Sequence, residues 1–218
     1  MGVSALRSAG GGRDAAMNRG IVRYNQYSMS RTPLQEALRA KTANDGPPVG
    51  ESDYRGATTA TSFSSAQEEF TALLNGCGVY DLGFRARISL TGGDRVRWMN
   101  GMITNNVRDL ATEHGVYAFL LNPQGRILGD MVVYNMGETL EVETDLSQLE
   151  KTIATFDHYI IMDDVEVTNI SEHWTALGVT GPNSRAVLKA AGIDVPELQP
   201  LQTHAAQCTC DCDCVQCT

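Results

Sequence analysis

The sequence predicts an α+β fold with mixed, largely antiparallel sheets, packed helices and disordered termini. Three observations lead to this prediction. Segments 116–121 and 126–135 have the patterning of strands, and a short turn joins them. Segment 146–160 places apolar residues at steps of three and four, which is typical of an amphipathic helix. The predicted elements follow the order β-α-β-β-β-α-β-β-α, and hairpins mixed with helices are typical of this fold class.

The patterned segments are confined to the middle of the chain, and this predicts the domain organisation. Hydrophobic residues make up 42% of the 218-residue sequence, which is enough for a packed core. Residues 1–62 are rich in Gly, Ser, Thr, Ala and Arg without a sustained period. We therefore expect a mostly disordered extension there, with a short helix at residues 32–41. Residues 63–202 form the expected folded region, and residues 203–218 form a Cys-rich tail that we interpret as a non-native appendage.

Helix-breaking glycines and a helix-capping aspartate predict the first folded elements. Residues 66–74 favour a helix, which Gly-Cys-Gly at residues 76–78 ends. Residues 87–91 alternate as a strand. A Gly-Gly turn follows, and Asp94 is the expected N-cap of the next helix.

A strong turn signal organises the second half of the folded region. Residues 122–125 have Asn, Pro and Gly at the first, second and fourth positions, between two predicted strands. A third strand is predicted at residues 139–144. Asp145 then begins the amphipathic helix, and Gln148 completes a capping-box pattern. The remaining predicted elements are strands at residues 165–170 and 174–179 and a helix from Pro182 to Gly192.

The charge balance argues against two classes of partner. The net charge is −9, whereas binding to a phosphate backbone depends on clusters of Lys and Arg. No apolar run approaches the roughly 18 residues that a membrane helix needs. We therefore expect no direct nucleic-acid binding and no membrane partner. The acid excess is local, because residues 141–172 contain nine carboxylates and one lysine. We interpret this run as a solvated acidic face, with an acidic interaction surface as the alternative.

The six cysteines are distributed unlike a disulfide framework. Cys77 stands alone, and the other five lie between Cys208 and Cys217. The folded region therefore has the pattern of a reduced, cytoplasmic protein. The tail thiols could bind Zn²⁺ or Cu(I) as a flexible cluster, but a segment appended by truncation or frameshift is the favoured interpretation. No metal site is predicted in the folded region.

The predicted hairpin brings a carboxylate among aromatic residues. If residues 122–125 close a two-residue loop, Tyr117 lies directly opposite Asp130, with Cβ atoms about 4.5–5.5 Å apart. A one-residue bulge would instead turn Asp130 to the other face. The predicted face also holds Phe119, Leu121, Leu128, Val132 and Tyr134. Such a face suits a planar, amphipathic heterocycle, which stacks on rings and exchanges a proton with a carboxylate. The alternative is an ordinary sheet surface with a solvated Asp130.

Four stretches of this region resemble a known superfamily. GVYD at residues 78–81, GVYAFLLNPQGRILGD at residues 115–130, DVEV at residues 164–167 and LGVTGP at residues 177–182 resemble the N-terminal region of glycine cleavage T-proteins, which are aminomethyltransferases. They resemble the YgfZ-type folate-binding proteins still more, and MITNNVRDL at residues 102–110 favours that branch. The resemblance covers residues 63–202 and implies the N-terminal lobes of the T-protein-like folate-binding fold.

The resemblance implies a tetrahydrofolate site. It implies that Tyr117, Asp130, Val132 and Tyr134 contact the folate. It also implies that Asp130 lies beside the nitrogens that carry the one-carbon unit, which makes Asp130 the catalytic candidate. The predicted hairpin places the same four residues on one face.

Two departures from the family pattern bear on the function. Phe84 and Arg85 occupy the positions of the His-Met pair of T-proteins, and the YgfZ-type motif Lys-Gly-Cys-Tyr-x-Gly-Gln is absent from the chain. The first expectation is a tetrahydrofolate-binding protein that supports iron–sulfur cluster maintenance and tRNA modification, with iron–sulfur assembly proteins as partners. The alternatives are a tetrahydrofolate-dependent aminomethyl- or methyltransferase and a truncated, non-functional fragment with a metal-binding Cys tail.

Overall fold

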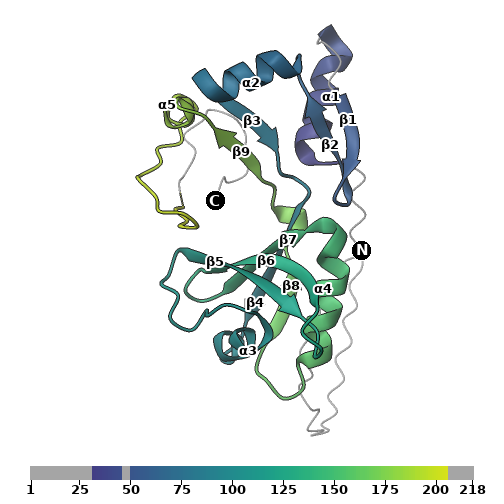
Figure 1. Ribbon diagram of the computed structural model, residues 1–218, viewed down its shortest axis with the longest axis vertical. Helices are drawn as coiled ribbons and strands as arrows, with labels where there is room; N and C mark the ends of the chain where they lie inside the picture. Colours follow the sequence, from purple (N-terminus) through teal and green to yellow (C-terminus); the bar gives the residue numbers. More distant parts are fainter. Residues whose placement is uncertain (1–30, 46–49, 206–218) are drawn as a thin grey trace, which may run out of the picture.

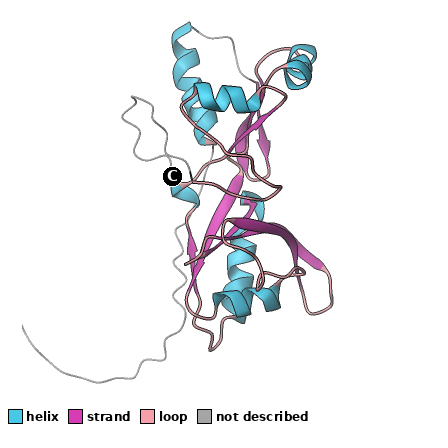
Figure 2. Cartoon of the chain, turned by 90° about the vertical axis from the view of Figure 1, so that its left-hand side faces the viewer, coloured by secondary structure: helices cyan, strands magenta, loops and turns pink. Residues whose placement is uncertain are grey.

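The computed structural model describes residues 31–45 and 50–205, which contain three antiparallel sheets. A five-stranded sheet has the strand order β5-β6-β7-β4-β8, and β1-β2 and β3-β9 form separate pairs. The five-stranded sheet lies in the lower half of the molecule with two helices, and the smaller sheets lie in the upper half with the other three (Figure 1; Figure 2). The predicted α+β class with largely antiparallel pairing is confirmed.

The elements of the lower half carry most of the buried residues. Its strands are β4 (Arg85–Thr91), β5 (His114–Leu121), β6 (Ile127–Asn135), β7 (Leu140–Asp145) and β8 (Glu166–Asn169). Its helices are α3 (Arg95–Met102) and α4 (Leu146–Tyr159), and a short 3-10 helix, η1 (Ser171–His173), follows β8. The strands and helices match the predicted segments to within a few residues.

The elements of the upper half bury much less. They are α1 (Pro33–Asp45), β1 (Gly50–Tyr54), β2 (Ala57–Ser62), α2 (Ala66–Asn75), β3 (Gly78–Asp81), β9 (Leu177–Thr180) and α5 (Ser184–Ala190). Neither α2 nor α5 contains a buried residue. Ser65 and Glu68 form a capping box that stabilises the start of α2. Local capping therefore contributes more to this helix than core packing does.

One hydrophobic core lies between the five-stranded sheet and helices α3 and α4. On α4, the predicted apolar face is confirmed, since Leu149, Ile153 and Phe156 are all buried in this core. The rings of Trp98 on α3 and Phe156 meet edge to face, with centroids 5.3 Å apart. Because strand side chains alternate, the opposite face of the same sheet remains open for polar residues.

The N-terminal region differs from the expectation of disorder. Residues 1–30 lie outside the described residues, but α1 extends beyond the predicted 32–41, and β1 and β2 form a hairpin within the predicted extension. Polar contacts hold this segment. Buried Thr32 bonds through its hydroxyl to Asp81, and its backbone N–H donates to Thr58 O at 3.0 Å. Hydrophobic periodicity does not report such contacts.

Two further predictions are corrected. The strand predicted at residues 174–179 begins three residues later, as β9 (Leu177–Thr180), and it pairs with β3. Asp94 precedes α3, but its side chain makes no capping hydrogen bond. It accepts a hydrogen bond from Asp164 N at 3.0 Å and pairs with Arg97, so it ties the helix start to a distant loop. Most of the Cys-rich tail, including all five of its cysteines, lies outside the described residues.

Candidate ligand-binding face of the five-stranded sheet

The β5–β6 turn closes differently from the two-residue loop expected. Gly125 N donates to Asn122 O at 2.9 Å, as in a β-turn, and Asn122 N donates to Arg126 O at 2.9 Å. The loop therefore has three residues. Gly125 occupies the left-handed region at φ 78°, which glycine adopts without strain. This longer loop moves the register by one residue.

A bulge moves the register once more and restores the side-chain alternation. The pairing shifts between Leu120 and Leu121, so that Leu128 is the extra residue on β6. Two shifts of one residue return the side chains beyond the bulge to their predicted faces. Tyr117 is paired with Val132 rather than with Asp130. The prediction of direct opposition is therefore wrong, whereas the predicted shared face is confirmed for Tyr117, Asp130, Val132 and Tyr134.

Two leucines of the predicted face pack elsewhere. Leu128 packs against the hydrophobic core, and Leu121 lines a separate pocket at the hairpin tip. Phe119 remains where the alternation places it, directly opposite Asp130. Its ring meets that of Tyr117 edge to face, with centroids 5.4 Å apart. The face is therefore narrower and more aromatic than expected.

Asp130 is held by neutral hydrogen-bond donors. The Tyr117 hydroxyl donates to Asp130 Oδ2 at 3.0 Å, and Gln148 Nε2 makes a long contact of 3.5 Å with Oδ1. The hydrogen bond from the phenol to the carboxylate raises the pKa of Tyr117 above its usual value, and partial burial and the Asp130 charge act in the same direction. Thr144 fixes the backbone of the same residue by donating to Asp130 O at 2.9 Å.

The two residues of the predicted capping box at the start of α4 bond to side chains of this face and its surroundings, and not to the helix backbone. Asp145 is the N-cap residue but makes no side-chain capping bond. Its carboxylate pairs with Arg55 and Arg85, each at 2.6 Å. Gln148, the expected partner at the third helical position (N3) of the capping box, contacts Asp130 instead. The predicted capping box is therefore wrong, although the helix begins where it was predicted.

Arginines on β4 pair with acidic residues on β7 in a regular ladder. Arg85 contacts Glu143 at 2.9 Å in addition to Asp145, and Arg87 contacts Glu141 at 2.7 Å and Glu143 at 2.9 Å. Each arginine thus bonds the acidic residue opposite and the acidic residue two positions along the partner strand, on the same face. These three acidic residues were interpreted as part of a solvated acidic face. In the structure they are half-buried or buried and paired.

The ladder distinguishes Asp130 from its neighbours. Three carboxylates on this face, Glu141, Glu143 and Asp145, pair with arginines. Within residues 31–45 and 50–205, Asp130 has no cationic partner at salt-bridge distance. Its charge lies beside the rings of Tyr117 and Phe119, where a ligand nitrogen could donate a hydrogen bond or a proton to it.

Sequence reasoning missed Arg87 and Trp174, which contribute to this face. Arg87 stacks on Tyr134 and on Trp174, a residue expected in a strand. Burial raises the pKa of Tyr134, and the Glu143 carboxylate adds to this effect, which Arg87 and Arg85 only partly offset. A signal for the ladder was present. Basic residues on β4 and acidic residues on β7 each alternate with apolar ones, and opposite charges at period two favour adjacent strands.

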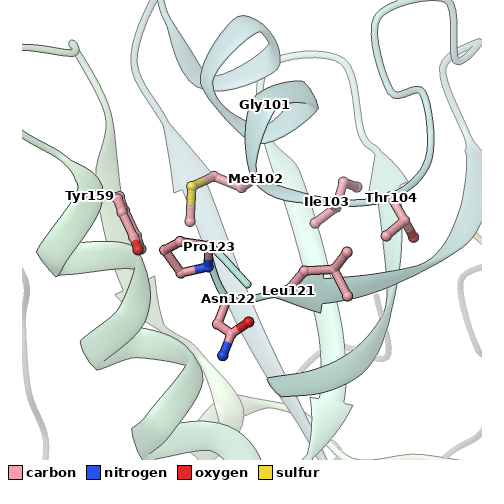
Figure 3. A pocket seen from close by; sticks show the side chains of 8 residues that line it. All are labelled: Gly101, Met102, Ile103, Thr104, Leu121, Asn122, Pro123 and Tyr159. Atoms are coloured by element: carbon pink, nitrogen blue, oxygen red, sulfur yellow. The ribbon is translucent and has the colours of Figure 1, made fainter. Parts of the chain in front are cut away.

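A separate pocket of about 410 Å³ lies beside the hairpin tip (Figure 3). Met102, Pro123 and Tyr159 gather on one side of it, and Ile103, Thr104 and Leu121 lie on the other. None of the four predicted ligand residues lines this pocket.

The residues that depart from the T-protein pattern have structural contacts. Phe84 is buried, and its ring meets that of Tyr54 edge to face at 4.9 Å. Arg85 belongs to the ion-pair ladder. Both residues therefore join the β1–β2 hairpin to the five-stranded sheet, through Tyr54 directly and through Asp145 to Arg55. Neither contacts Asp130.

The described residues contain neither a metal-binding cluster nor a membrane-spanning helix. Among residues 31–45 and 50–205, His, Cys, Asp and Glu side chains form no group of three or more that could hold a metal ion. In the same residues, each helix is too short or too polar to cross a membrane. Cys77 is half-buried and forms no disulfide.

Comparison with known proteins places the chain in a family. The sequence is 30% identical over 177 residues to an aminomethyltransferase of Bacillus velezensis, covering 79% of this chain and 46% of the relative. It is 27% identical over 150 residues to the aminomethyltransferase of Bacillus subtilis, covering 68% of this chain and 41% of the relative. The chain thus spans less than half the length of these curated relatives.

The fold agrees with these sequence matches. The crystal structure of glycine cleavage system aminomethyltransferase T from Bartonella henselae superimposes with a TM-score of 0.70 at 20% identity, over 80% of this chain and 47% of that one. At this identity the match shows the fold. Residues 22–211 match the model of one family, described as GCVT N-terminal domain. The chain therefore belongs to the GCVT N-terminal domain family of the aminomethyltransferase superfamily, as the resemblance implied.

Proposed function

We propose that this chain binds tetrahydrofolate on the polar face of the five-stranded sheet, with Tyr117, Asp130, Val132 and Tyr134 as contacts. The observation that carries the proposal is the position of Asp130, which is bonded by the Tyr117 hydroxyl at 3.0 Å while its neighbouring carboxylates pair with arginines. A pteridine ring offers flat stacking area and ring nitrogens that donate hydrogen bonds. Aromatic rings and one available carboxylate are complementary to it.

The use of the bound folate admits two proposals. In the first, the protein is a YgfZ-type accessory factor in iron–sulfur cluster maintenance and tRNA modification, acting in the cytoplasm with iron–sulfur assembly proteins. The structural roles of Phe84 and Arg85 favour it, since the positions of the T-protein His-Met pair are occupied by packing and ion-pair residues. In this case folate binding requires no chemistry at Asp130.

In the second proposal, the protein takes part in one-carbon transfer, as the names of its relatives suggest for them. Asp130 would then be the catalytic residue that accepts or returns a proton at the folate nitrogen bearing the one-carbon unit. Because the chain spans less than half of those relatives, transfer activity is tested separately from binding. A third possibility, metal binding by the Cys-rich tail, concerns residues outside those described.

Titration calorimetry with 5-formyltetrahydrofolate tests the proposed binding. We expect a saturable 1:1 signal from the wild-type chain. Asp130→Asn removes the charge that the ligand nitrogen would meet and should weaken binding roughly 10- to 100-fold, the usual value of a charge-assisted hydrogen bond.

Asp157→Asn is the matched control, because Asp157 is an exposed carboxylate on α4. It should bind as the wild type does. Equal weakening by both substitutions would indicate a long-range charge effect and would contradict a contact at Asp130. Absence of binding by the wild type would contradict the proposal for this chain as it stands.

A further inference from the structure

The guanidinium group of Arg87 lies over two aromatic rings. Its central carbon lies 4.7 Å from the ring centroid of Tyr134 and 4.9 Å from that of Trp174. Its edge is also occupied, since Nε donates to Glu141 and Nη1 donates to Glu143. The side chain is 8% exposed. Arg87 is therefore held by two rings and two carboxylates, and little of its side chain is exposed to a ligand.

The ring of Tyr134 is confined on a second side by a glycine. Gly115 is the cross-strand partner of Tyr134, and a Cβ atom added there would lie 2.7 Å from Cδ1 and Cε1 of the ring. The ring therefore lies over Gly115 and uses the space that a side chain would fill. Within the described residues, the Tyr134 hydroxyl makes no hydrogen bond, in contrast to that of Tyr117. This hydroxyl is thus available to a ligand while the ring that carries it is held.

We propose that Arg87 is a positioning residue, which holds the Tyr134 ring in the orientation that the ligand meets, over the space left by Gly115. The inference rests on the proposed folate binding and extends it to a residue that does not touch the ligand. An arginine suits this role because its planar group can stack on two rings while its edge bonds two carboxylates. A lysine keeps the charge but can neither stack in this way nor form the fork.

The expected effect follows from pre-organisation. A ring already held in place loses little rotational freedom when the ligand binds, whereas a released ring must be ordered at that step. Arg87→Lys should therefore weaken binding of 5-formyltetrahydrofolate roughly 3- to 10-fold, the equivalent of ordering one side chain. Arg126→Lys, at an exposed position of the hairpin loop, is the control and should have no effect.

A double-substitution test separates positioning from other effects. In a Tyr134→Ala background, no ring remains to be held, so Arg87→Lys should leave the affinity unchanged. If Arg87→Lys weakens binding equally with and without Tyr134, Arg87 acts on the ligand or the fold by another route, and the proposal is overturned.

A ligand-free readout tests the same contact if the wild type does not bind folate. In protein with ¹³C-labelled tyrosine, the phenol resonance of Tyr134 reports its own titration. Because Arg87 lowers the pKa of Tyr134, Arg87→Lys should raise that pKa and Arg87→Met should raise it further. An unchanged titration in a folded Arg87 variant would show that the guanidinium does not lie on this ring in solution. Failed folate binding with a shifted titration would refute the proposed function and leave the contact intact.

Discussion

The two faces of the five-stranded sheet are made by the same strands and have opposite chemistry. The face toward α3 and α4 is apolar, and most of its strand residues are at most 1% exposed. These residues are Ala86, Ile88, Leu90, Ala118, Leu120, Met131, Val133, Leu140, Val142 and Val167. The other face holds the tyrosines, Asp130 and the ion-pair ladder. Alternation along each strand thus separates residues that stabilise the fold from those that would meet a ligand.

A substitution in the apolar face of β4 should have the largest effect. Ile88 is fully buried, so Ile88→Ala should lower the free energy of unfolding by about 2–5 kcal/mol, through lost burial and the cavity left behind. Urea denaturation followed by circular dichroism measures the change. At low temperature, the folded fraction should retain its affinity for 5-formyltetrahydrofolate. Loss of affinity in protein that is still folded would show that the two faces are not independent.

Breaking the ion pairs between the β1–β2 hairpin and the five-stranded sheet should have an intermediate effect on the free energy of unfolding. Asp145 is buried and pairs with Arg55 and Arg85, so Asp145→Asn should cost about 1–3 kcal/mol in unfolding free energy, the usual value for hydrogen bonds to charged groups. Asp157→Asn, on the exposed side of α4, should change it by less than about 0.5 kcal/mol. Equal effects would mean that the ion pairs of Asp145 contribute nothing beyond surface charge.

The Tyr117–Asp130 hydrogen bond predicts a change in titration. Because the bond raises the pKa of Tyr117, Asp130→Asn should bring that pKa back toward about 10. A folded-state pKa above the unfolded value means that this contribution to stability is present below about pH 10 and is lost as the pH rises through the folded-state pKa. The ¹³C phenol resonance of Tyr117 followed between pH 8 and 12 measures it. An identical titration curve in both proteins would exclude the hydrogen bond in solution.

The smallest expected effect is a gain in stability away from both faces. Gly101 lies in α3, and an added Cβ would meet no atom within 4 Å. Gly101→Ala should therefore raise the free energy of unfolding by about 0.5–1 kcal/mol through its better helix propensity. Folate affinity should not change. Destabilisation would indicate that this end of α3 needs the flexibility of glycine.

The sequence predicted the elements that have a buried apolar face better than the elements that polar contacts hold. Hydrophobic periodicity located α4 and the strands of the five-stranded sheet, because each has a buried face. It did not locate β1, β2 or the loop that carries Trp174, which polar contacts and stacking hold in place. Turn composition placed the β5–β6 turn. The register was wrong by two residues, because loop length and bulges depend on local backbone geometry that composition leaves open.

The shared face of the four candidate residues was predicted, but the charged residues around it were not. Alternation placed Tyr117, Asp130, Val132 and Tyr134 on one face, and the two register shifts preserved that face. The ion-pair ladder was missed because the acidic run was considered without the arginines of the neighbouring strand. Long-range pairing decides whether a charge is solvated or compensated, and a single sequence does not fix the strand order.

Tyrosine-specific NMR tests the central claim most directly. In protein with ¹³C-labelled tyrosine, addition of 5-formyltetrahydrofolate should shift the phenol resonances of Tyr117 and Tyr134, while Tyr80 and Tyr159 serve as internal references away from the proposed face. The account predicts saturable shifts at the first pair, which are reduced in Asp130→Asn. Shifts at Tyr159 with none at Tyr117 and Tyr134 would place the ligand in the pocket at the hairpin tip and would contradict the proposed site.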